Sequence, residues 1–320
     1  MTPGTHLVTL PRYTRYGDRA NRRVSKSATT SEHDMRGKMG QFFEITVSEG
    51  NHMAPDGTGN KNGTIVAGRD LSLSFGGIKA LSNVDFQVRR GEIVSIIGPN
   101  GAGKTCLVNC ITGYYRPQKG TITYDGRDIT GLPSYRIARL GISRTFQNPS
   151  LYPHMTAFDN LMLARYMHTR TTLPEAMLFF GRSRREEIEG RRFVESIISF
   201  ARIQDLSNRT VATMSYGQRK LVEIARALTM EPRIIFLDEP MSGLDEVMKE
   251  LVAELIISIR NQGITVVLVE HDMQVVMGLS NSVIVLDFGQ KIAEGSPDDV
   301  CRNSQVTAAY IGGIVAGRSC

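Results

Sequence analysis

The feature that most constrains the fold is the glycine-rich turn GPNGAGKT at residues 98–105, which fits the pattern G-x-x-x-x-G-K-[ST]. The short apolar stretch at residues 93–97 predicts a strand before it, and CLVN continues it as a helix. Glycines let backbone N–H groups converge on phosphate oxygens, and the start of the helix adds its positive dipole. A chance glycine-rich turn is disfavoured in this context, so we expect the chain to bind a nucleoside triphosphate.

Several residues of this turn are predicted to contact the nucleotide. Lys104 would neutralise the β- and γ-phosphates, and the Thr105 hydroxyl would ligate Mg²⁺. Asn100, Gly101 and Gly103 complete the predicted phosphate-binding loop.

A second motif, RIIFLDEP at residues 233–240, combines a buried strand with two adjacent acids at its end. Asp238 would hold Mg²⁺ through its water shell, and Glu239 would polarise an attacking water. An Asp-Glu pair alone is more often part of a solvated turn. Beside a phosphate loop, the pair is predicted to be catalytic.

Composition excludes several classes of protein. The 320 residues suit two ordinary domains or one large domain with an insertion. A net charge of +6 is mild and its basic residues are spread along the chain, which argues against nucleic-acid binding. Apolar runs fall short of the ~18 residues of a membrane span, and the N-terminus lacks the apolar core of a secretory signal. Cys106, Cys110, Cys301 and Cys320 form no CxxC pair, which favours a reduced, cytosolic protein.

Residues 1–62 differ from the rest of the chain. They are rich in polar residues and glycine, and contain nine Lys and Arg against six Asp and Glu. We predict a flexible polar tail. A basic arm for lipid or nucleic acid, or a translation start at Met39 or Met53, are the alternatives.

The remaining pattern predicts an α/β fold. Alternating apolar residues between 65 and 130 predict strands, with a two-residue hairpin turn at Asp125-Gly126. Residues 134–208 read as mainly helical, and the charged stretch 182–192 as a solvated helix face. Beyond residue 214 strands and helices alternate, which indicates a parallel sheet.

A third motif lies between the two nucleotide motifs. MSYGQRK at residues 214–220 precedes a predicted helix, and Gln147 and His271 each follow a predicted strand. This arrangement resembles the ATP-binding cassette of ABC transporters. The family signature usually reads LSGGQ, and here Met214 replaces the Leu and Tyr216 the first Gly.

Other stretches resemble one subfamily, the larger ATP-binding subunit of branched-chain amino-acid importers. An aromatic residue in the signature is typical of it. The further matches are RTFQ at 144–147, EHDM at 270–273, AYIG at 309–312 and the helical stretch near 170–200.

The resemblance implies a P-loop ABC ATPase fold with a mixed or parallel core sheet, an N-terminal antiparallel β-subdomain and an inserted helical subdomain. The cassette would span residues 63–320, with the helical subdomain at approximately 148–213 and a C-terminal extension at approximately 298–320.

It also implies roles for single residues. In the family, Phe75 would stack on adenine, Gln147 would reach the metal and the attacking water, and His271 would contact the γ-phosphate. The alternatives are a buried Phe75, a surface Gln147 and a structural His271.

Four residues would act on a second cassette. Ser215, Gly217 and Gln218 in the signature would complete its nucleotide site, and Asp245 in the loop SGLD would contact it. An ordinary helix cap is the alternative for Ser215 and for Asp245.

The predicted function is therefore ATP hydrolysis that energises an amino-acid importer, with ATP and Mg²⁺ as cofactors. The implied partners are a second cassette, identical or distinct, two transmembrane permease subunits and, indirectly, an extracytoplasmic solute-binding protein. The expected location is the cytoplasmic face of the inner membrane. The alternatives are a soluble ABC ATPase of translation or DNA repair, an ATP-driven regulatory module, and an importer cassette for an amide or a carboxylate.

Overall fold

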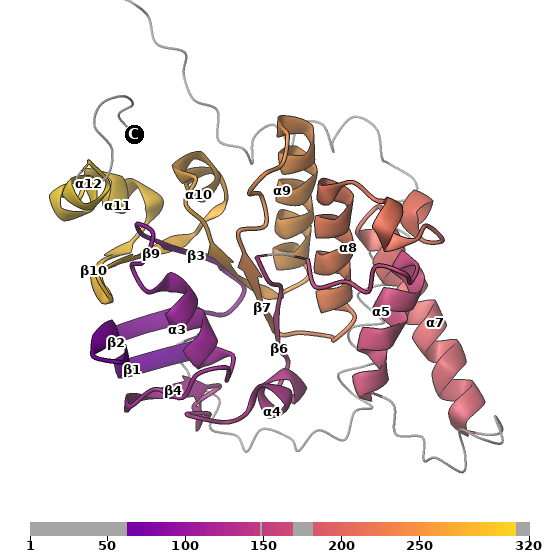
Figure 1. Ribbon diagram of the computed structural model, residues 1–320, viewed down its shortest axis with the longest axis horizontal. Helices are drawn as coiled ribbons and strands as arrows, with labels where there is room; N and C mark the ends of the chain where they lie inside the picture. Colours follow the sequence, from indigo (N-terminus) through magenta and orange to yellow (C-terminus); the bar gives the residue numbers. More distant parts are fainter. Residues whose placement is uncertain (1–62, 148, 169–181, 312–320) are drawn as a thin grey trace, which may run out of the picture.

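The computed structural model describes residues 63–147, 149–168 and 182–311 (Figure 1). The predicted tail, the alternative starts at Met39 and Met53, and Cys320 lie outside the described residues. The predicted C-terminal extension is described as far as residue 311.

An antiparallel sheet opens the described chain, in the order β2-β1-β4-β5. Its strands are β1 (Thr64–Phe75), β2 (Ile78–Arg89), β4 (Lys119–Tyr124) and β5 (Arg127–Asp128). The turn between β4 and β5 has positive φ at Asp125 (48°) and Gly126 (77°), as a two-residue hairpin requires. The prediction of an antiparallel β-subdomain is confirmed.

The core sheet has six strands in the order β10-β9-β3-β8-β7-β6. They are β3 (Ile93–Ile97), β6 (Ile142–Arg144), β7 (Ile234–Asp238), β8 (Thr265–Val269), β9 (Ser282–Asp287) and β10 (Gln290–Gly295). All neighbours pair in parallel except β10, which is antiparallel to β9. Every residue of β3, β7 and β8 is buried, because helices or the second sheet cover both faces. The predicted mixed α/β sheet is confirmed.

Helix α3 (Lys104–Ile111) packs between the two sheets (Figure 1). Its buried residues Leu107, Val108 and Ile111 belong to the apolar core that β1, β2 and β4 share with the central strands. These contacts hold α3 against the central strands, with its start at the end of the loop that follows β3.

A group of helices lies away from the antiparallel sheet, beside β6 and β7 (Figure 1). It contains α5 (Ala157–Arg165), η1 (Tyr166–His168), α7 (Arg182–Phe200), η2 (Gln204–Leu206), η3 (Val211–Thr213) and α8 (Tyr216–Leu228). The charged stretch 182–192 is helical, as predicted.

The remaining helices cover the sheet or follow it. They are α4 (Ser134–Arg139), α9 (Glu246–Asn261), α10 (Met273–Leu279), α11 (Pro297–Arg302) and α12 (Ser304–Ile311). Among the helices of the described ranges, none has the length and apolar character needed to cross a membrane.

The topology brings four connections together. Because β3, β6, β7 and β8 are parallel, their carboxyl ends meet at the same edge of the sheet. In open α/β sheets ligands bind outside this edge, and all the predicted catalytic residues follow these strands.

Candidate nucleotide site at the strand ends

The loop between β3 and α3 depends on its glycines. Gly98, Gly101 and Gly103 have φ values of 151°, 82° and 101°. A Cβ atom on Gly98 would also lie 2.1 Å from the carbonyl oxygen of Leu286. Glycine is therefore required, both for the backbone conformation and for the close approach of β9.

Lys104 folds back into this loop. Its Nζ donates to the carbonyl oxygens of Gly98 (2.6 Å) and Pro99 (3.0 Å), and the residue is only 8% exposed. Burial lowers the pKa of Lys104, although the carboxylates of Glu239 and Asp238 act in the opposite direction. Asn100, Gly101 and Thr105, in contrast, are exposed to solvent.

The two acids at the end of β7 differ in environment. Asp238 is buried, whereas Glu239 is partly exposed and has a left-handed φ of 45°. The Glu239 N–H donates to Val269 at the end of β8 (2.9 Å). A left-handed Glu is uncommon and such strain concentrates at functional sites.

Glu239 lies between two other predicted catalytic residues. Nε2 of Gln147 donates to its Oε2 at 3.1 Å, and Nδ1 of His271 lies 3.8 Å from its Oε1. The three residues follow β7, β6 and β8 respectively. The predicted catalytic set is thus contiguous in space, with Lys104 and Asp238 beside it.

Arg144, the last residue of β6, also reaches this site. Its Nη2 donates to Oδ2 of Asp238 at 2.9 Å, and Nη1 donates to Asn109 in α3. From the sequence, Arg144 belongs to the motif RTFQ but has no predicted role. Only the pairing of β6 with β7 brings Arg144 to Asp238, so no local signal could have revealed it.

Helix α8 holds the loop that carries Gln147. Nζ of Lys220 donates to the carbonyl oxygen of Gln147 (2.7 Å). Oε1 of Glu223 accepts from the N–H groups of Phe146 (3.2 Å) and Ser150 (3.4 Å).

Both side chains are almost completely buried, with exposures of 2% for Lys220 and 1% for Glu223. Burial lowers the pKa of Lys220, and the charge of Glu223 and of other nearby carboxylates acts against this shift. Burial raises the pKa of Glu223, and the N–H groups of Phe146 and Ser150 together with the charge of Lys220 act against it. Neither residue has a role predicted from the sequence. The only feature of the sequence that points to them is their opposite charge, three positions apart on a predicted helix.

The signature residues lie at the start of α8. Ser215 caps the helix, with its hydroxyl accepting from the Gln218 N–H, and Oε1 of Gln218 accepts from the Ser215 N–H. A Cβ on Gly217 would lie 2.9 Å from Met248 of α9, so a glycine also allows α8 and α9 to pack closely.

Asp245 caps α9, accepting from the Met248 N–H at 2.8 Å, which agrees with the helix-cap alternative. Within the described residues, no hydrogen bond joins Ser215, Gly217, Gln218 or Asp245 to the phosphate loop.

Phe75 ends β1 and is 46% exposed, so the buried alternative is wrong. Its ring packs edge-on against Tyr115, with centroids 5.1 Å apart and an interplanar angle of 68°. Tyr115 was not singled out from the sequence. An exposed ring supported from one side leaves its other surface open to a planar ligand.

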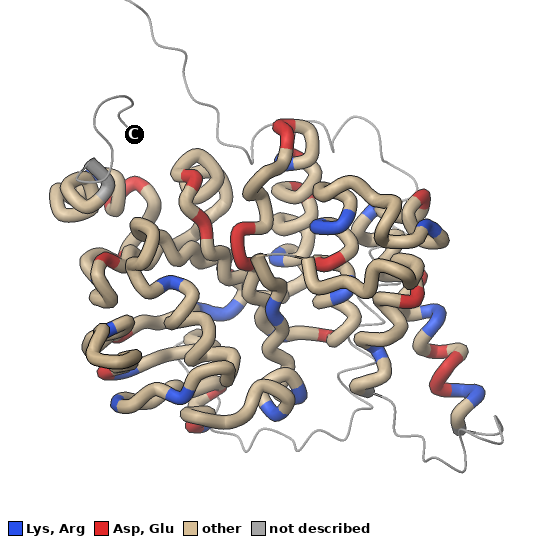
Figure 2. The backbone as a smooth tube through the Cα atoms, in the orientation of Figure 1, with Lys and Arg blue, Asp and Glu red and all other residues tan. Residues whose placement is uncertain are grey.

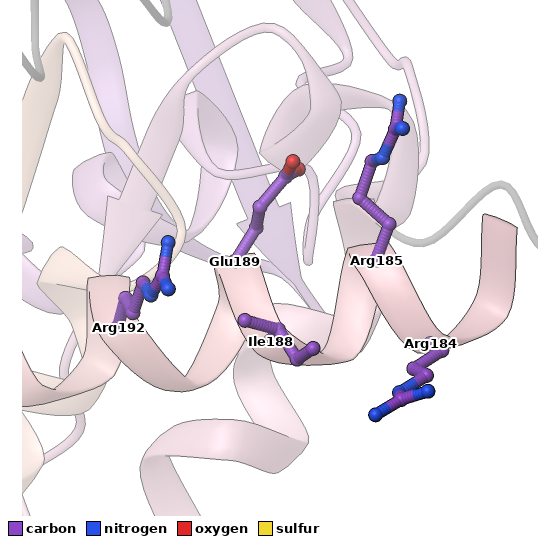
Figure 3. Close-up of a pocket in the computed structure, with 5 residues that line it drawn as sticks. All are labelled: Arg184, Arg185, Ile188, Glu189 and Arg192. Atoms are coloured by element: carbon purple, nitrogen blue, oxygen red, sulfur yellow. The ribbon is translucent and has the colours of Figure 1, made fainter. Parts of the chain in front are cut away.

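A shallow hollow of about 270 Å³ lies elsewhere, on α7. It is lined by Arg184, Arg185, Ile188, Glu189 and Arg192, all exposed, and Figure 3 shows Arg185 and Glu189 on the same side of the helix. This agrees with the solvated charged face predicted there. Figure 2 likewise shows Lys and Arg distributed over many elements of the described chain.

Comparison with known proteins gives two family matches. Residues 81–242 match the ABC transporter family, and residues 290–316 match the branched-chain amino acid ATP-binding cassette transporter family.

Curated relatives agree with these matches. The chain is 40% identical over 243 residues to the high-affinity branched-chain amino acid transport ATP-binding protein BraF of Pseudomonas aeruginosa, covering 76% of this chain and 95% of the relative. It is 39% identical over 249 residues to the corresponding LivG protein of Salmonella typhimurium, covering 78% of this chain and 98% of that protein.

Solved structures agree on the fold. A nucleotide-free ATP-binding cassette from an ABC transporter superposes with a TM-score of 0.69 at 31% identity, covering 78% of this chain and 99% of that one. A dimeric cassette bound to ADP and Pi superposes with a TM-score of 0.62 at 28% identity, covering 73% and 99%.

Proposed function

The chain belongs to the ABC transporter family of ATP-binding cassettes, and on that basis we propose that it is the ATP-hydrolysing subunit of an importer for branched-chain or related amino acids. One observation carries the choice of solute. The similarity to transport proteins of that specificity extends over 95% of BraF and 98% of LivG.

ATP binds at the edge formed by the strand ends. The N–H groups at the start of α3 and the Lys104 ammonium favour the phosphates, since both supply positive charge. Phe75 supports this assignment because its half-exposed ring is available to stack on the adenine.

The residues present also fit a Mg²⁺ ion, which the family implies. The Thr105 hydroxyl is exposed at the start of α3, and Oδ1 of Asp238 receives no hydrogen bond within the described part of the chain. Both are hard oxygen donors of the kind Mg²⁺ prefers. When bound, the ion would neutralise charge on the β- and γ-phosphates. Gln147 is the third candidate ligand.

Glu239 acts as the general base in hydrolysis. It accepts the proton of the water that attacks the γ-phosphate, while the bond between that phosphorus and the bridging oxygen breaks. Gln147 donates a hydrogen bond to one of its carboxylate oxygens and His271 lies 3.8 Å from the other, so the base is oriented before the water arrives. The gain comes mainly from positioning and charge stabilisation.

The signature residues Ser215, Gly217 and Gln218 serve the nucleotide of a second cassette, and Asp245 contacts that cassette. This assignment is supported by the absence, among the described residues, of hydrogen bonds from these side chains to the phosphate loop of their own chain. It also agrees with the dimeric form of the solved relative bound to ADP and Pi. Two permease subunits and an extracytoplasmic solute-binding protein complete the importer, and the cassette lies on the cytoplasmic face of the membrane.

A reconstituted importer tests the proposal. The chain is purified with the permease and solute-binding subunits it captures, placed in vesicles, and assayed for ATP hydrolysis. We expect leucine, isoleucine or valine to stimulate hydrolysis with the binding protein present. Stimulation by an amide or a carboxylate alone would overturn the choice of solute, and capture of ribosomal or DNA-repair proteins in place of a permease would overturn transport.

A further inference from the structure

The ion pair between Arg144 and Asp238 is almost completely enclosed by protein. Both side chains are nearly buried, with exposures of 7% and 8%. Asn109 of α3 accepts a second hydrogen bond from the guanidinium. A buried pair retains its geometry when further hydrogen bonds fix the partners, as Asn109 does here.

Two aromatic rings complete the surroundings of Arg144. Its guanidinium carbon lies 5.2 Å from the ring centroid of Phe146 and 5.8 Å from that of Tyr114. The two rings meet edge to face at 5.8 Å. Cation–π contacts of this kind keep a guanidinium in place without supplying a competing negative charge.

The consequence for Asp238 concerns its two carboxylate oxygens. Oδ2 accepts from Arg144, whereas Oδ1 receives no hydrogen bond from any residue in the described ranges. The positive charge of Arg144 also offsets the negative charge of Asp238. A divalent cation that binds without nucleotide would depend on that negative charge.

We propose that Arg144 is a positioning residue that reserves a single oxygen of Asp238 for a divalent cation and makes cation binding depend on nucleotide. This inference rests on the proposed function, in which Asp238 contributes to a Mg²⁺–ATP site. One partly neutralised carboxylate is a weak site for Mg²⁺, which binds to proteins through few carboxylates together with substrate phosphates. The nucleotide must therefore supply the remaining charge.

Mn²⁺ binding, followed by the paramagnetic resonance signal of the free ion, tests this without measuring turnover. The full chain, Arg144→Met and Arg144→Lys are titrated with Mn²⁺, with and without ADP. The unaltered chain should bind Mn²⁺ tightly only with ADP. Arg144→Met should bind it at least about tenfold more tightly without ADP, because a neighbouring positive charge is removed. Arg144→Lys should stay close to the unaltered chain.

Controls separate the possible failures. Adding Asp238→Asn to Arg144→Met should abolish the gain, and Arg202→Met, which breaks an exposed pair with Glu254, should leave Mn²⁺ binding unchanged. If Arg144→Met does not fold, Asn109→Leu removes one anchor of the guanidinium and should give a smaller gain. A folded variant that binds ADP but gains no Mn²⁺ affinity would overturn the role of Arg144. If the unaltered chain binds no Mn²⁺ even with ADP, the proposed metal–nucleotide site itself is wrong.

Discussion

Nε2 of Gln147 donates a hydrogen bond to Oε2 of Glu239 at 3.1 Å, across 92 positions of sequence. The other carboxylate oxygen lies 3.8 Å from Nδ1 of His271. Glu239 is therefore fixed by one hydrogen bond from a neighbouring strand end and lies close to a residue of another, and its own backbone has the left-handed φ of 45°. This arrangement is expected of a base that must be positioned before its water binds.

Replacing Glu239 with Gln should nearly stop hydrolysis and preserve ATP binding. Glutamine keeps the size and the polar contacts but cannot accept the proton, so we expect kcat to fall about 100-fold or more. Release of phosphate measures hydrolysis, and equilibrium binding of a fluorescent ATP analogue measures affinity.

The matched control is Glu246→Gln, at an acid that is 80% exposed in the first turn of α9. It should change neither quantity. Undiminished turnover of Glu239→Gln would remove this residue from the role of base.

Phe75→Ala should weaken ATP binding by about tenfold, since stacking of a base on an aromatic ring contributes about 1–3 kcal/mol. Binding of inorganic tripolyphosphate should stay the same, because it has no base. Competition experiments against a fluorescent nucleotide measure both ligands. Tyr135→Ala, at a similarly exposed aromatic residue on α4, serves as the control. Equal losses of affinity for ATP and for tripolyphosphate would show that Phe75 supports the phosphate-binding loop and does not stack on the adenine.

Local patterns were sufficient to predict much of the fold. Alternation along β1 and β2, the Asp125-Gly126 turn and the apolar strands around the nucleotide motifs each depend on neighbours in sequence. The gathering of Gln147, Glu239 and His271 also follows from sequence, because each comes directly after a strand of a parallel sheet.

Contacts that depend on strand order and helix burial could not be predicted. Arg144 and Asp238 are 94 positions apart, and they meet only because β6 pairs with β7. Lys220 and Glu223 read as solvent-facing charges beside the apolar stripe of Leu221 and Leu228, since periodicity predicts one buried face. Helix α8 is instead enclosed on nearly every side, so these charges are buried and bind backbone groups.

Lys220→Met should destabilise the protein by about 2–3 kcal/mol. Methionine fills the volume, but the Gln147 carbonyl loses its donor and the buried Glu223 loses a nearby positive charge. Urea unfolding followed by circular dichroism measures the loss.

Arg202→Met is the control for this loss. It breaks an ion pair in which the Arg side chain is 64% exposed, so its cost should stay below about 1 kcal/mol. An equally small loss for Lys220→Met would mean that its bond to the loop adds no net stability.

Glu270 makes stability depend on pH. Glu270 directly follows β8 and precedes His271. It is 1% exposed and accepts a hydrogen bond from the Met241 N–H at 3.2 Å. Burial raises its pKa from 4.5 to about 7, helped by the carboxylates of Glu239 and Asp272 and opposed by the N–H groups of Met241 and His271.

The folded protein therefore binds this proton more tightly than the unfolded chain does. Its contribution to the free energy of unfolding is fully present below about pH 4.5, falls as pH rises, and levels off above about pH 7. Glu270→Gln keeps an acceptor for Met241 but cannot ionise, so the variant should lose this dependence. The stability of the unaltered chain relative to Glu270→Gln should decrease by about 2–3 kcal/mol between pH 5 and pH 8. Urea unfolding of both proteins at four pH values measures the difference, and other titrating groups cancel in it. A difference that is constant with pH would mean that the carboxyl keeps its ordinary pKa.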